Sequence, residues 1–175
     1  MDKTNTEKIS LLSLVTDIRK SAVLALKKPK SCLIGHQGWK AEQKILALWA
    51  ADCAERVLPY FEKKYPEDER PRKAIIACRE WVRTGVFRMA DVRNSALAAH
   101  AAARETGEDG SARFAARSAG HAIATAHVPT HAFGAAAYAI RAAATHSDNA
   151  NNGIIKERTW QLERLRSIAR IGYKK

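Results

Sequence analysis

Four histidines stand close together in the middle of the chain, and imidazole is the commonest protein ligand for transition metals. They are His100, His121, His127 and His131. If their helices packed side by side, the rings could converge on one ion, as inward-facing ligands do in helical bundles. No H-E-x-x-H spacing is present, and Pro129 interrupts the helical register before His131. The sequence therefore favours imidazoles that hydrogen-bond across close-packed helices over a metal site, and we expect no cofactor.

Arg113, Arg117 and His121 follow one another at intervals of four residues, so a helix would align them as one cationic stripe. Such a stripe could hold a phosphate or a carboxylate of a partner. It could also be a structural face whose guanidinium groups bond to carbonyl groups at helix ends. The structural reading is the more frequent one, and Arg113 and Arg117 are kept as candidate partner contacts.

Two further pairs of charged residues are candidate partner contacts. Asp52 and Glu55 lie on the predicted polar face of a helix, where they could attract a basic partner. Arg70 and Arg72 bracket a proline at a predicted helix start, and arginine is frequent among interface anchors. Ion pairs within the chain would explain the same arginines.

Signatures of known catalytic sites are missing from the sequence. There is no G-x-S-x-G motif, no glycine-rich phosphate loop and no catalytic cysteine signature. Cys32, Cys53 and Cys78 form no C-x-x-C pair, so we expect reduced thiols in a cytoplasmic protein. The sequence favours a protein that binds another macromolecule and is not an enzyme, with a metal-dependent enzyme that uses the core histidines as an alternative.

The net charge of +12 indicates a possible polyanionic partner, but the charge is concentrated at the two ends. Residues 1–40 carry eight Lys or Arg against three Asp or Glu, and residues 148–175 carry seven against three. A nearly balanced middle is weaker support for nucleic-acid recognition than a basic stripe through the core. A helical nucleic-acid-binding protein is therefore an alternative function.

Alanine dominates residues 90–144, and no segment alternates apolar and polar residues as a strand would, so the fold class is all-α. Prolines and glycines divide the chain into about six to seven helices. The predicted helices cover residues 6–27, 40–61, 71–84, 90–106, 111–128, 130–145 and 154–170. Pro59 should bend or end the second helix, and Ser111 and Thr130 are the expected N-caps of the fifth and sixth.

The helices are expected to form one compact array. Ile45, Trp49, Cys53 and Val57 recur at i, i+4 and should share one apolar face. Small residues such as Gly120 allow helix axes to approach closely. The domain organisation we expect is an N-terminal helix and loop at 1–40, a core at 41–147 and a basic C-terminal helix at 148–175 packed on it. No secretory signal or membrane-length apolar run is evident.

Six short strings in the middle of the chain are distinctive. They are WAADCAERVL at 49–58, RPRKAI at 70–75, REW at 79–81, AAHAAAR at 98–104, AGHAIATAHV at 119–128 and AAAYA at 135–139. With these strings the chain resembles the bacterial putative immunity protein family numbered five, over about residues 49–138. The resemblance implies an all-helical cytoplasmic antitoxin that protects its producer in bacterial competition by capturing a cognate protein toxin. Because nuclease inhibitors are commonly acidic, the net charge of +12 gives no reason to expect a nuclease as the toxin.

Overall fold

The computed structural model describes residues 16–22 and 40–172, and within these ranges it contains helices and no strands. Residues 40–172 form seven helices, namely α2 (Lys40–Val57), α3 (Pro59–Glu62), α4 (Arg70–Thr84), α5 (Met89–Glu105), α6 (Gly110–Ala124), α7 (His131–His146) and α8 (Ala150–Gly172). Residues 16–22 are also helical. The all-α prediction is confirmed. Most of the helix expected at 6–27, and the loop with Cys32, lie outside the described residues.

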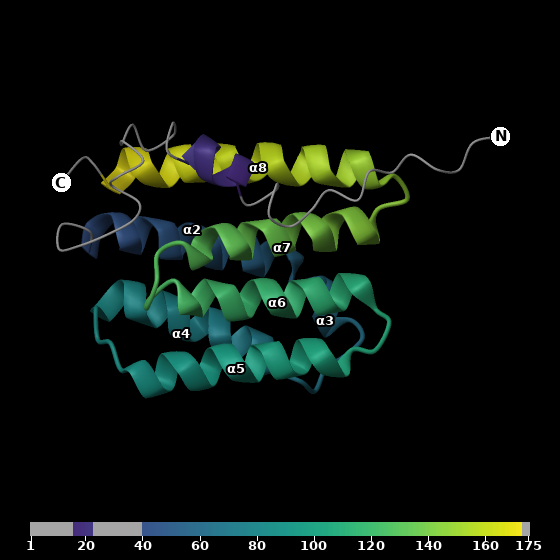
Figure 1. The fold of residues 1–175 in the computed structure, drawn as a ribbon, viewed down its shortest axis with the longest axis horizontal. Helices are drawn as coiled ribbons and strands as arrows, with labels where there is room; N and C mark the ends of the chain where they lie inside the picture. Colours follow the sequence, from purple (N-terminus) through teal and green to yellow (C-terminus); the bar gives the residue numbers. More distant parts are fainter. Residues whose placement is uncertain (1–15, 23–39, 173–175) are drawn as a thin grey trace.

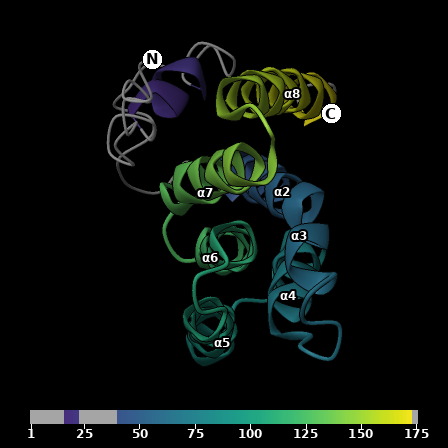
Figure 2. The same ribbon diagram turned by 90° about the vertical axis from the view of Figure 1, so that its right-hand side faces the viewer.

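The helices form two layers with their axes close to parallel. Helices α5, α6 and α7 make one layer, and α2, α3 and α4 make the other (Figure 1; Figure 2). Helix α8 lies over the end of both layers, against α7 and α2, and residues 16–22 lie beside it (Figure 2). Helix α6 is the centre of the array, because it contacts α2, α3, α4, α5 and α7.

The composition of α6 explains how one helix can have so many neighbours. Its nine buried residues are alanine, serine or glycine, apart from Ile123. Small side chains let neighbouring backbones approach on several sides at once, which is the close packing that the alanine-rich sequence predicted. The layer of α5, α6 and α7 is consequently tight.

Proline and glycine fix the ends of the helices in the other layer. Helix α2 ends at Val57, and α3 begins at Pro59, as expected from the missing proline amide. Helix α4 has Pro71 in its first turn and ends at Gly85, whose φ of 71° is left-handed. The apolar face predicted for α2 is confirmed. Its members Ile45, Trp49, Cys53 and Val57 are all buried.

The N-caps of α6 and α7 differ in part from the prediction. Asp109 caps α6 by accepting a hydrogen bond from the amide of Ala112. Ser111, the expected cap, lies inside the helix and donates to the same carboxylate at 2.8 Å, so that prediction was wrong. Thr130 occupies the N-cap position of α7, but its side chain makes no capping bond.

Helix α8 is joined to both layers by buried polar contacts. The indole Nε1 of Trp49 donates to the carbonyl of Gln161 at 2.8 Å, and the Gln161 amide donates to the carbonyl of Ala136 at 3.1 Å. Arg56 forms an ion pair with the buried Glu157 at 2.8 Å. These contacts attach α8 to α2 and α7. No helix within the described ranges is long and apolar enough to cross a membrane.

Candidate functional site

Three of the four candidate histidines form a row across the layer of α5, α6 and α7. His121 on α6 lies between His100 on α5 and His131 on α7, with ring centroids 5.2 Å away on each side. The Nδ1 atoms of His121 and His131 are 3.1 Å apart, so one ring donates a hydrogen bond to the other. This bond between helices is of the kind that the sequence predicted. His127 is exposed and makes no ring contact with the described residues.

Two glycines make room for the row. A Cβ atom placed on Gly120 of α6 would lie 2.5 Å from Cε1 of His100. A Cβ atom on Gly134 of α7 would lie 2.8 Å from Nδ1 of His121. Each ring therefore lies in the space where the next helix has no side chain, and only glycine allows the present positions of the rings.

The row does not have the geometry of a metal centre. Within the described residues, no group of three or more His, Cys, Asp or Glu side chains could hold a metal ion. The facing nitrogens of His121 and His131 bond to each other, while Nδ1 of His100 is buried and has no hydrogen-bond partner in the described chain. The described residues therefore give no support to the alternative of a metal-dependent enzyme.

Burial and neighbouring cations keep the imidazoles neutral. Burial, together with smaller contributions from Arg117, Arg104 and His131, lowers the pKa of His100 from 6.5 to about 4. Burial also lowers the pKa of His121 to about 3, with contributions from His100, His131 and Arg117. No carboxylate contributes to either shift. The surroundings of the row are thus short of negative charge.

Aromatic side chains continue the row along α6 and α7. The ring of Tyr138 stacks on His121 with centroids 5.3 Å apart, and Phe114 stacks on Tyr138 at 6.1 Å. The guanidinium of Arg141 lies 4.2 Å from the centroid of Phe114. Sequence reasoning missed these three residues, although Phe114 and Arg117 lie three residues apart, and Tyr138 and Arg141 do too, a spacing that places each pair on one helix face.

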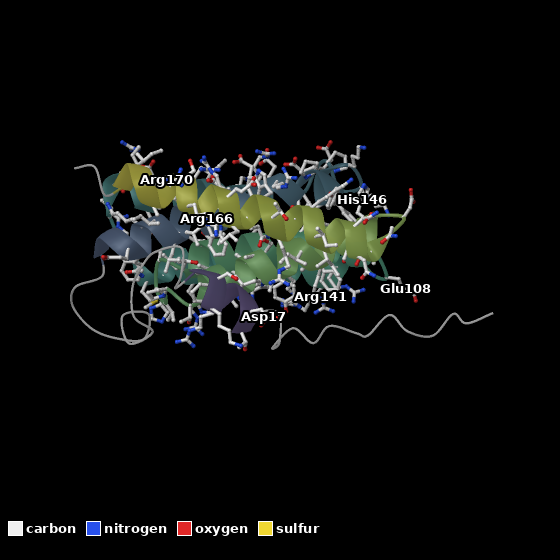
Figure 3. All side chains as sticks on the ribbon, turned by 90° about the horizontal axis from the view of Figure 1, so that it is seen from above. Asp17, Glu108, Arg141, His146, Arg166 and Arg170 are labelled. Carbon is white, nitrogen blue, oxygen red and sulfur yellow. The ribbon has the colours of Figure 1, made fainter. Side chains whose placement is uncertain are left out.

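We call this set of side chains the imidazole face. It consists of His100, Arg104, Phe114, Arg117, His121, His131, Tyr138 and Arg141. Arg141 lies at the edge of the molecule, away from Arg166 and Arg170 on α8 (Figure 3). Arg113, which the sequence grouped with Arg117, instead donates to the carbonyl of Gly107 just beyond α5, which is the structural role described for such a stripe.

Asp52 and Glu55 are engaged within the chain. Asp52 is only 8% exposed, so its placement on a polar outer face was wrong. One of its oxygens accepts from Arg79 of α4 at 2.8 Å, and the other accepts from Arg164 of α8 at 2.7 Å. Glu55 is exposed and pairs with the same Arg79. Asp52 thereby links three helices, a role that the sequence pattern of α2 alone does not indicate.

Arg70 and Arg72 are also held by carboxylates of the chain. Arg70 pairs with Asp68 at 2.7 Å and with Glu105 at the end of α5. Arg72 donates to Glu62 of α3 at 2.8 Å. Ion pairs within the chain were the alternative to partner contacts for these two arginines, and the structure contains such ion pairs. Both arginines tie the start of α4 to neighbouring helices.

An exposed apolar segment connects α4 to α5. Val86, Phe87 and Met89 are 63%, 42% and 44% exposed. A cavity of about 360 Å³ opens beside them between the two helices, with Trp81 and Val92 among its lining residues. Exposed phenylalanine and methionine are enriched in protein interfaces, so this segment is a second surface at which a partner could bind.

The chain belongs to the family described as Imm-5 like putative immunity protein, whose model matches residues 36–168. The match begins before α2 and ends within α8, so it includes the two layers and most of the helix that covers them. It confirms the family resemblance and extends it beyond residues 49–138. No curated protein and no solved structure matches the chain.

Proposed function

We propose that the protein is an immunity protein that neutralises a cognate bacterial toxin by binding it in equimolar amounts. The observation that carries the proposal is the family match over residues 36–168, which includes nearly the whole helical body. The contacts of the candidate residues favour binding over catalysis, because these residues already bond to other groups of the chain. His121 and His131 form a hydrogen bond with each other. Asp52, the most buried of the acidic candidates, is held by two arginines.

Neutralisation by binding sets a requirement on affinity. An immunity protein must leave almost no free toxin, so the dissociation constant should be nanomolar or lower. An interface of ordinary size can reach this value if its central contacts are well packed and already ordered before binding. The rigid helical layers of this chain offer such surfaces, because their side chains are positioned by close packing between backbones.

The test first searches the neighbouring genes for a product with a toxin-like C-terminal domain and uses that domain as the partner. We expect coexpression to restore the growth of cells that make the toxin domain, and the purified proteins to form an equimolar complex in light scattering. Protection should fail once toxin exceeds immunity protein, because each molecule is consumed by one toxin. Protection by far fewer molecules than toxin would indicate catalysis, and the lack of any complex at micromolar concentration would contradict the proposal.

A further inference from the structure

We propose that the imidazole face receives the toxin, and that it binds a patch of aspartate and glutamate side chains on the toxin surface. This inference rests on the proposed function, since it names the binding surface and the chemistry of the partner.

The arginines of the chain fall into two groups. Six of them have a carboxylate partner within the chain: Arg56, Arg70, Arg72, Arg79, Arg83 and Arg164. On the imidazole face, by contrast, Arg104 and Arg117 form no ion pair with the described residues, and Arg141 contacts the ring of Phe114 instead. Arg88, Arg93, Arg158, Arg166 and Arg170 also form no ion pair with the described residues, but they are exposed, whereas Arg117 and Arg141 of the imidazole face are half-buried.

A half-buried cation without a counter-charge has lost part of its hydration and gained little in return. Arg117 and Arg141 are both half-buried. Arg117 also lowers the pKa values of His100 and His121, and no carboxylate of the chain offsets its effect. A carboxylate from a partner would supply the missing charge and accept charge-assisted hydrogen bonds. Charge complementarity thus selects an acidic protein surface as the partner of this face.

The face is also ordered before the partner arrives. His100 and His121 are fixed over Gly120 and Gly134, and Tyr138 stacks on His121. Side chains that are already immobile lose little conformational entropy on binding, which favours high affinity. In addition, Nδ1 of His100 has no hydrogen-bond partner in the described chain, so one polar group of the face is unsatisfied.

Stacking on this face argues against nucleic acid as the partner. Proteins that bind single strands offer open aromatic faces on which bases stack. Here Tyr138 lies over His121, and the guanidinium of Arg141 covers Phe114. The ring faces are already occupied by neighbouring side chains, while the guanidinium donors are available to oxygen acceptors.

The test compares two double charge reversals that change the net charge equally. The face variant is Arg117→Glu with Arg141→Glu, and the control is Arg158→Glu with Arg166→Glu on the exposed side of α8. Binding to the toxin domain identified in the test of the proposed function is measured by calorimetry. We expect a loss of about 100-fold or more for the face variant and only a few-fold for the control. The neutral pair Arg117→Gln with Arg141→Gln should give an intermediate loss, and circular dichroism checks that each variant is folded.

The outcomes separate this inference from the proposed function. If the wild type binds the toxin and both charge reversals bind it equally well, the imidazole face is not the interface, although the immunity function stands. If Phe87→Ser abolishes the complex and the face variant does not, the segment between α4 and α5 is the interface. Tighter binding of an RNA oligonucleotide than of toxin, lost in the face variant, would overturn the acidic protein partner. If the wild type forms no complex, both proposals fail.

Discussion

The imidazole of His100 occupies the space that a side chain at position 120 would need, because Gly120 passes directly beneath its Nδ1 and Cε1 atoms. A Cβ atom at Gly120 would lie 2.7 Å from Nδ1, a separation that real contacts do not show. His100 and Gly120 therefore determine how closely α5 can approach α6. Their relationship can be tested without knowledge of any partner.

We expect Gly120→Ala to destabilise the protein by about 1–3 kcal/mol, and Gly120→Leu by at least as much, because the added atoms displace the ring. Alanine has the higher helix propensity, so a purely local effect would be stabilising. Urea denaturation measures the change. In a His100→Ala background the cost of Gly120→Ala should largely disappear, and an unchanged cost would show that His100 is not the obstacle.

Part of this site could have been predicted from sequence. A glycine inside a helix costs about 1 kcal/mol relative to alanine, so Gly120 and Gly134 within alanine-rich helices indicate close approach. The sequence does not indicate what approaches them. That His100 and His121 are the rings concerned depends on the order and rotation of three helices, which local spacing does not determine.

Asp52→Asn should cost about 1–3 kcal/mol, because it weakens charge-assisted hydrogen bonds to Arg79 and Arg164 that join α2 to α4 and α8. Glu69→Gln is the matched control. It also removes one negative charge, but from an exposed i, i+4 pair with Lys73 that water screens, and should change stability far less than Asp52→Asn. Equal effects in thermal unfolding would contradict the structural role of Asp52.

Helical periodicity explains why the prediction of an exposed Asp52 was wrong. The i, i+4 pattern correctly identified the buried stripe through Trp49 and Cys53, but it assumes that α2 packs on one side only. Helix α2 in fact contacts α4, α6, α7 and α8, so the next position around the helix is buried too. Asp52 lies at such a position, and it pairs with Arg79 and Arg164, which are distant from it in sequence.

Stability should fall as the pH is lowered from about 6.5 to about 3. The pKa values of His100 and His121 are lowered to about 4 and about 3 in the folded protein, so the unfolded chain binds protons first in this range. The loss is complete once the pH passes below the folded values. We expect His121→Gln to give a shallower pH dependence than the wild type, measured by urea denaturation at a series of pH values. His146→Gln, which changes an exposed histidine outside the row, is the control, and the interpretation fails if both variants keep the full slope.

Two cysteines should resist alkylation in the folded protein. Burial raises the pKa of the Cys53 thiol and raises that of Cys78 to about 12, so neither forms much of the reactive thiolate near neutral pH. Cys78 also donates to the carbonyl of Ala122 at 3.2 Å. Mass spectrometry after iodoacetamide treatment should find both unmodified in buffer and modified in urea. Rapid labelling of either in buffer would show that the packing around α2 and α4 opens easily.

Replacement by phenylalanine should destabilise the protein more at Trp49 than at Trp160. Trp49 is 2% exposed and its indole bonds to the carbonyl of Gln161, so Trp49→Phe removes a contact between α2 and α8 and leaves a cavity. We expect a loss of about 1–3 kcal/mol in denaturant unfolding. Trp160 is half-buried beneath the guanidinium of Arg56, at 4.6 Å from its ring, and Trp160→Phe should cost about 0.5–1 kcal/mol. If the order were reversed, α8 would be held by its outer contacts, and the buried bond between Trp49 and Gln161 would contribute little to its attachment.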